Sequence, residues 1–167
     1  MKELTPDNWL EPDTAQTVLD ARAWRDDFLA VRLDAAVPRE LADMFEAARG
    51  AMIYGYFFQP LVTLGVEHCY RALEAAARAR CTLLGLPVSC ADSQGKEHPL
   101  SFSHNLRALG ARSLISEEDT KLWYQARELR NWAASPDRQT LLTPDHGATA
   151  LSRTAELLGK LFRDSPE

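Results

Sequence analysis

The chain has 167 residues, of which 46% are hydrophobic and 26% are charged, and its formal net charge is −5. This composition excludes a disordered or fibrous chain, and the length predicts one domain that buries its own core without disulfides or a metal. The negative net charge works against non-specific binding of nucleic acid by the whole surface, although a local basic patch remains compatible with it.

A membrane-spanning or secreted protein is not expected. The longest apolar stretch is interrupted by four polar residues: Glu67, His68, Arg71 and Glu74. No segment of the chain therefore reaches the roughly 18 consecutive apolar residues of a membrane span. The first residues lack the apolar segment of a secretion signal. The three cysteines are an odd number without CxxC spacing, which favours reduced thiols and a cytoplasmic location.

Residues 1–36 are predicted to form an N-terminal extension that packs on a helical bundle made by residues 37–165. Pro6, Pro12 and several polar residues at the start of the chain indicate a loose arm. We expect Trp9, the large apolar side chain of this arm, to attach it to the body of the protein.

Two helices are predicted before the middle of the chain. The first runs from Thr14 to about Ala30, although the short apolar run Phe28–Leu33 also fits a strand. The second begins at Pro38, a residue that suits the first turn of a helix, and Gly50 is a candidate break in it. Its core-facing side chains recur at spacings of three and four residues: Leu41, Phe45, Ala48 and Met52.

The strongest helical pattern runs from Tyr54 to Leu84. One side of this predicted helix is apolar and carries Phe58, Val62, Gly65, Cys69, Leu73, Ala76 and Ala77. On another side Glu67 precedes Arg71 and Glu74 precedes Arg78 by four residues, a spacing typical of an exposed helical face.

The second half of the chain is predicted to add a loop and three helices. Gly85 and Pro87 end the long helix, and the polar segment Ser89–Pro99 is predicted to be a loop. Ser101 is expected to cap a short helix that ends at Leu109, before Gly110.

The last two helices have clear starts. Ser116 followed by three acidic residues predicts a capped helix whose core side is formed by Leu122, Ala126, Leu129 and Ala133. Ser135-Pro136 ends it. Thr143-Pro144-Asp145 then begins a final helix with its apolar stripe at Ala148, Leu151, Ala155, Leu158 and Phe162. Together these elements predict an all-α fold, an up-and-down bundle of about five helices with an N-terminal extension.

Metal and cofactor sites are not indicated. His68 and Cys69 are adjacent, so on a helix their side chains point about 100° apart, and no HxxxH, HExxH or CxxC spacing places two ligands on one face. Neither GxGxxG nor GxxxxGK[ST] is present, which excludes the common phosphate-binding loops.

A cysteine nucleophile would have to be Cys90, the thiol in the predicted loop. Its base would be one of three histidines: His98, His104 or His146. No local signature supports this arrangement, and the neighbouring Asp92 is acidic, whereas a reactive thiol needs an electropositive setting. A structural cysteine is therefore the favoured interpretation.

One segment carries a resemblance to a known family. The long helix contains Leu-Glu-Ala-Ala (residues 73–76), and a short helix follows it. Residues 129–136 then read Leu-Arg-Asn, followed by three further residues, a small residue and a proline. In this order, over roughly Pro38 to Arg163, the chain resembles the HEPN-like helical proteins of prokaryotes. In members with RNase activity an Arg-Asn pair is followed by a histidine five residues after the arginine. The resemblance maps the pair onto Arg130 and Asn131 and places Ser135 where the family has its histidine.

Two functions follow from this comparison. Because Ser135 cannot replace an imidazole as acid or base near neutral pH, the first is a non-catalytic domain that forms a homodimer and binds a protein or RNA partner, in a toxin–antitoxin, defence or stress system. The alternative is a metal-independent RNase that uses Arg130 and Asn131 with His104 as base, and in which Arg127, Arg130 and His104 bind the ligand.

A third reading makes the protein a bundle that binds a small ligand between its helices. An apolar cavity near Trp123, Tyr124 and the long helix would support it. Arg130 and Asn131 also have a purely structural interpretation, because arginine near a helix C-terminus interacts favourably with the helix dipole and asparagine hydrogen-bonds nearby backbone.

Overall fold

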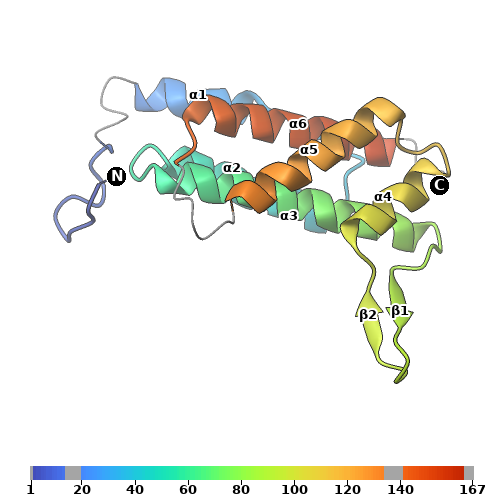
Figure 1. Ribbon diagram of the computed structural model, residues 1–167. Coiled ribbons are helices and arrows are strands. Elements are labelled where there is room, and N and C mark those ends of the chain that lie inside the picture. Colours follow the sequence, from blue (N-terminus) through green and yellow to red (C-terminus); the bar gives the residue numbers. More distant parts are fainter. Residues whose placement is uncertain (1, 14–19, 134–140, 164–167) are drawn as a thin grey trace.

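The computed structural model describes residues 2–13, 20–133 and 141–163; for residues 129–133 only the backbone is described. The all-α prediction is confirmed, because the described part is dominated by six helices and contains a single small two-stranded sheet (Figure 1). The elements are α1 (Ala21–Ala30), α2 (Arg39–Tyr54), α3 (Pro60–Leu83), β1 (Ser89–Ala91), β2 (Glu97–Pro99), α4 (Phe102–Gly110), α5 (Glu117–Ala133) and α6 (Pro144–Arg163).

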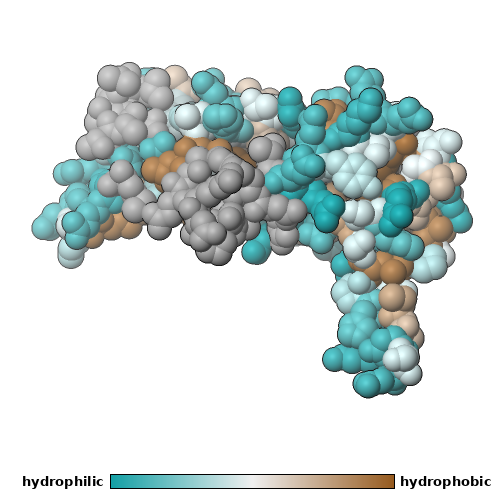
Figure 2. Space-filling view, in the orientation of Figure 1, coloured by the Kyte–Doolittle hydropathy of each residue, from teal (hydrophilic) through white to brown (hydrophobic). Residues whose placement is uncertain are grey.

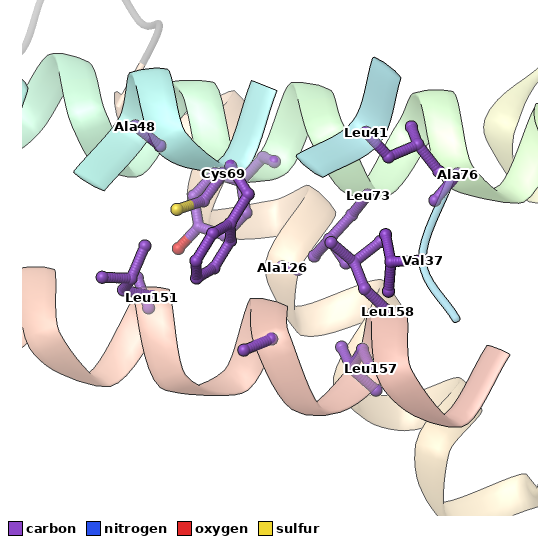
Figure 3. Packing of buried hydrophobic residues seen from close by; sticks show 14 of the residues in the cluster. Val37, Leu41, Ala48, Cys69, Leu73, Ala76, Ala126, Leu151, Leu157 and Leu158 are labelled. Carbon is purple, nitrogen blue, oxygen red and sulfur yellow. The ribbon is translucent and has the colours of Figure 1, made fainter. Parts of the chain in front are cut away.

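The body is built around α3. This helix lies antiparallel to α2, α6 packs along another side of it, and α5 crosses it obliquely (Figure 1). The shared core contains side chains from all of these helices, some of which Figure 3 shows: Val37, Leu41, Ala48, Cys69, Leu73, Ala76, Ala126, Leu151, Leu157 and Leu158. No described helix is long and apolar enough to cross a membrane.

The boundary between the second helix and the long helix differs from the prediction. Tyr54 ends α2, and α3 begins only at Pro60, which occupies its first turn. The turn between them is stabilised by short-range backbone hydrogen bonds such as Phe57 N to Tyr54 O, at 3.0 Å. The apolar residues of this turn continue the helical spacing, so periodicity alone does not reveal it. Gly50 lies inside α2 and does not break it.

The alternative of a strand at Phe28–Leu33 is wrong. Phe28 belongs to α1, which continues to Ala30, and it is buried together with Trp24. Spacing of four residues puts both rings on one helical face, and their burial against the core decides the conformation. The predicted start of this helix at Thr14 falls in residues 14–19, outside the described part.

The segment from Ser89 to Pro99 is a hairpin and not the predicted loop. Its register pairs Ser89 with Pro99, Cys90 with His98, and Ala91 with Glu97. The turn is closed by Asp92, whose carboxylate accepts hydrogen bonds from the backbone N–H groups of Gln94 and Lys96. The strands lack alternating apolar residues, which is why the pattern did not indicate them. The hairpin projects from the body, and its far end is hydrophilic (Figures 1 and 2).

The N-terminal arm is attached by a residue that the sequence did not suggest. Trp9 is 59% exposed, so it does not attach the arm. Asp13 does so, because it is buried, its N–H donates to the Tyr56 carbonyl at 3.0 Å, and its carboxylate accepts from the Gln59 N–H at 3.1 Å. Such contacts satisfy buried backbone groups. The domain boundary at residue 36 stays a prediction.

Candidate functional site

Helix α5 carries most of the predicted site, and its beginning is firmly held. The Ser116 hydroxyl accepts from the Asp119 N–H at 3.0 Å, as the capping pattern predicts. Burial acts to raise the pKa of Asp119, but hydrogen bonds from Lys160 and Ser116 outweigh it and leave that pKa lowered. In the next turn Trp123 is buried and lies against the Phe102 ring of α4, at 6.1 Å between ring centroids.

The predicted site residues are only partly brought together. The Arg127 guanidinium donates to the Ser103 hydroxyl at 3.0 Å, and His104, the next residue of α4, is exposed. Arg130 and Asn131 lie in the last turn of α5, where only the backbone is described. Ser135 lies outside the described residues. The roles assigned to these three residues therefore stay predictions.

The exposed hairpin holds the other candidate for nucleophilic chemistry. Cys90 and His98 are cross-strand partners, and the His98 ring lies 2.8 Å from the Asp92 carboxylate. Directly opposed residues of an antiparallel pair have side chains on the same face. Cys90 is exposed. Among the described residues no group of three or more His, Cys, Asp or Glu side chains is arranged to hold a metal ion.

A cavity of about 420 Å³ opens between α3, α5 and α6. Its floor is apolar and includes Val66, Leu73, Leu122, Ala126, Ala150 and Leu157. Its polar side is formed by the α6 residues Asp145, His146, Thr149 and Arg153, and Tyr70 enters it from α3. Leu122 and Ala126 flank Trp123 and Tyr124 in the sequence, the residues near which an apolar cavity would support the small-ligand alternative. Sequence reasoning did not find Tyr70 or Arg153, although residues 145, 149 and 153 share the four-residue spacing of one helical edge.

Tyr70, which lines this cavity, and its core-facing neighbour Cys69 are both neutral groups. Burial, followed by the neighbouring Cys69, raises the pKa of Tyr70 to about 12, although Arg153 acts in the opposite direction. Burial likewise raises the pKa of the Cys69 thiol to about 12, against a hydrogen bond with Thr154. Both groups are therefore protonated near neutral pH, so the Tyr70 hydroxyl is available as a hydrogen-bond donor.

The face of α3 that points away from the core is a second surface of interest. We call it the α3 outer face and define it by Leu64, Glu67, Arg71, Glu74, Ala75, Arg78, Ala79, Thr82 and Leu83. Its later residues line a shallow groove of about 590 Å³ together with Pro38 and Glu40. Leu64 and Leu83 are 53% and 65% exposed. Exposed large apolar residues next to a groove are common at sites of protein association.

Comparison of the chain with models of known families, with curated proteins and with solved structures gave no match.

Proposed function

We propose that the protein is a non-catalytic helical module, similar to the HEPN-like proteins, that works as a homodimer through the α3 outer face. The observation that carries the proposal is the order of charges on that face, Glu67, Arg71, Glu74 and Arg78. These residues recur every three or four positions, so they form one stripe along a helix of about 3.6 residues per turn.

The stripe is complementary to itself in one antiparallel register. A two-fold axis between Ala72 and Leu73 places Glu67 opposite Arg78 of the second copy, and Arg71 opposite Glu74 of the second copy. Every charge of the stripe then faces an opposite charge. A shift by one turn would place Arg71 opposite Arg78, and such like-charge contacts are costly at interfaces. The pattern therefore specifies register as well as association.

The four charges are also available for such a contact. The ion pairs found in the described part of the chain lie elsewhere, and none of them uses Glu67, Arg71, Glu74 or Arg78. The small side chains of Ala75 and Ala79 allow a second helix to approach closely, as small residues do where helices cross. Leu64 would lie near Thr82 of the second copy, which removes exposed apolar surface from water.

Charge reversal tests this interface. Arg71→Glu and Glu74→Arg are each expected to raise the dimer dissociation constant at least about tenfold, because each puts two like-charge pairs into the symmetric contact. The double variant Arg71→Glu/Glu74→Arg restores opposite charges and is expected to dimerise like the wild type. Sedimentation equilibrium at low and high salt measures these constants.

The control is Arg22→Glu, a charge reversal at an exposed position of α1, which should leave dimerisation unchanged. A monomeric wild-type protein would contradict the proposal. Equal dimerisation by all variants would exclude the α3 outer face as the contact, and failure of the double variant to recover would exclude the proposed register.

The non-catalytic part of the proposal has its own test. Wild-type protein and the Arg130→Ala variant are both expected to leave end-labelled RNA intact in the presence of EDTA, because Ser135 supplies no general acid or base with a pKa near neutral. An active RNase added to the same mixture checks that the conditions allow cleavage. Cleavage by the wild type that disappears in Arg130→Ala would restore the RNase alternative and make His104 the next residue to replace.

A cytoplasmic location is part of the same proposal. Cys69, Cys81 and Cys90 are free thiols, and two of them are buried. Free cysteines persist most readily in a reducing compartment.

A further inference from the structure

The cavity between α3, α5 and α6 has the general properties of a small-molecule site. Its volume of about 420 Å³ falls within the range of roughly 300–1,000 Å³ typical of ligand pockets. Its floor is formed by aliphatic side chains from three helices, so an apolar group that lies on this floor is shielded from water on that side. Polar groups are gathered along its α6 side, which is the arrangement that orients a ligand.

Two polar side chains that line the cavity, Tyr70 and Arg153, are placed to contact a ligand. Tyr70 is only 9% exposed. In the part of the chain that the structure describes, neither its hydroxyl nor the Arg153 guanidinium forms a hydrogen bond or an ion pair, although the two residues are close enough for an electrostatic interaction. Because Tyr70 lines the cavity, its hydroxyl can donate a hydrogen bond to an acceptor on a ligand bound there.

The charges around the cavity select the kind of ligand. Arg153 is the single permanent cation among the described lining residues, and Asp145 is an acidic residue on the same side. A guanidinium binds a carboxylate through two parallel hydrogen bonds. A doubly charged phosphate would meet the same single guanidinium and would be repelled more strongly by Asp145.

We propose that this cavity binds a small amphipathic carboxylate, with its apolar body on the floor and its carboxylate between Arg153 and the Tyr70 hydroxyl. The Thr149 side chain lies exposed on the same side of α6 and borders the entrance. The cavity and the α3 outer face use different sides of α3, so this proposal does not depend on dimerisation.

Equilibrium dialysis with three naphthalene derivatives separates the contributions of body and charge. The full-length protein is expected to bind 2-naphthoate. It should bind 2-naphthol, which has the same body without the charge, at least about tenfold more weakly, because a charge-assisted hydrogen bond is lost. Binding of 2-naphthyl phosphate should also be weaker than that of 2-naphthoate.

Substitutions then locate the binding. Arg153→Gln is expected to weaken 2-naphthoate binding at least about tenfold, and Thr149→Trp to abolish it by filling the entrance. The controls are Arg22→Gln on α1 and Ser152→Trp, an equally large side chain at an exposed neighbouring position of α6. Both controls should bind like the wild type, and circular dichroism should show that all variants are folded.

Three results would overturn the proposal. Absence of binding for all three compounds would mean that the cavity does not take this class of ligand. Unchanged binding by both folded Arg153→Gln and Thr149→Trp would place the compound elsewhere on the protein. Tighter binding of 2-naphthyl phosphate or 2-naphthol than of 2-naphthoate would exclude a carboxylate as the preferred group.

Discussion

Replacing Gly65 by alanine is expected to lower the free energy of unfolding by about 1–3 kcal/mol, whereas replacing Gly50 by alanine should raise it by about 0.5–1 kcal/mol. Both glycines lie inside helices, and both changes add one methyl group. The opposite signs follow from what the new Cβ would meet.

At Gly65 the α2 and α3 backbones come too close for a side chain. A Cβ there would lie 2.8 Å from the Ala48 carbonyl oxygen and 2.6 Å from Cγ of Met52. The Met52 side chain is fully buried, so its neighbours limit how far it can move away. The Ala48 carbonyl belongs to the backbone of α2 and cannot move by itself. The two helices must therefore separate. Separation weakens the contact between α2 and α3 on which the core is built.

At Gly50 a Cβ would have no neighbouring atom within 4 Å. Alanine then only reduces the conformational freedom of the unfolded chain and favours the helix. Urea denaturation followed by circular dichroism measures both variants under identical conditions. Equal effects of the two substitutions would contradict the close approach of α2 and α3 at Gly65.

Replacing Trp123 by alanine is expected to lower the free energy of unfolding by about 3–5 kcal/mol. Trp123 is the largest fully buried side chain of the protein's described part, and it attaches α5 to α4 through Phe102. Its loss leaves a large cavity that the surrounding helices cannot close completely. Because α5 forms one wall of the proposed ligand site, binding of 2-naphthoate should weaken as well.

Amide hydrogen exchange shows whether the Trp123→Ala substitution destabilises α5 alone or the whole domain. Exchange in α5 should become faster than exchange in α2 and α3, because α5 loses its main buried anchor while the contact between α2 and α3 remains. Trp123→Phe is the control, since it keeps an aromatic ring and should cost less. Equal acceleration in all helices would show that α5 does not open separately.

The helices were predictable where local signals agree with the apolar spacing. Ser101 and Ser116 cap α4 and α5 as their side chains suggested. Gly85 follows the end of α3 with a φ of 65°, a left-handed conformation that glycine adopts without strain. These features depend on a few neighbouring residues, so sequence contains the information that they need.

Prediction failed where neighbouring residues did not decide the structure. The start of α3 was missed because apolar residues of the preceding turn continue the helical spacing, and the hairpin was missed because its strands are exposed on both faces. Trp9 was expected to attach the N-terminal arm only because it is a large apolar residue. The anchor is Asp13, whose partners Tyr56 and Gln59 come from a distant part of the chain.

The two proposed sites differ in the same way: one depends on neighbouring residues of one helix and the other on tertiary packing. The sequence by itself determined the charge order of the α3 outer face, because residues three and four positions apart on a helix share a side wherever that helix lies in the fold. Only the tertiary structure decided the cavity, since Tyr70 of α3 and Arg153 of α6 meet through the packing of two distant helices. Packing of this kind depends on the shapes of many side chains at once. The spacing of residues along one helix carries no information about those shapes.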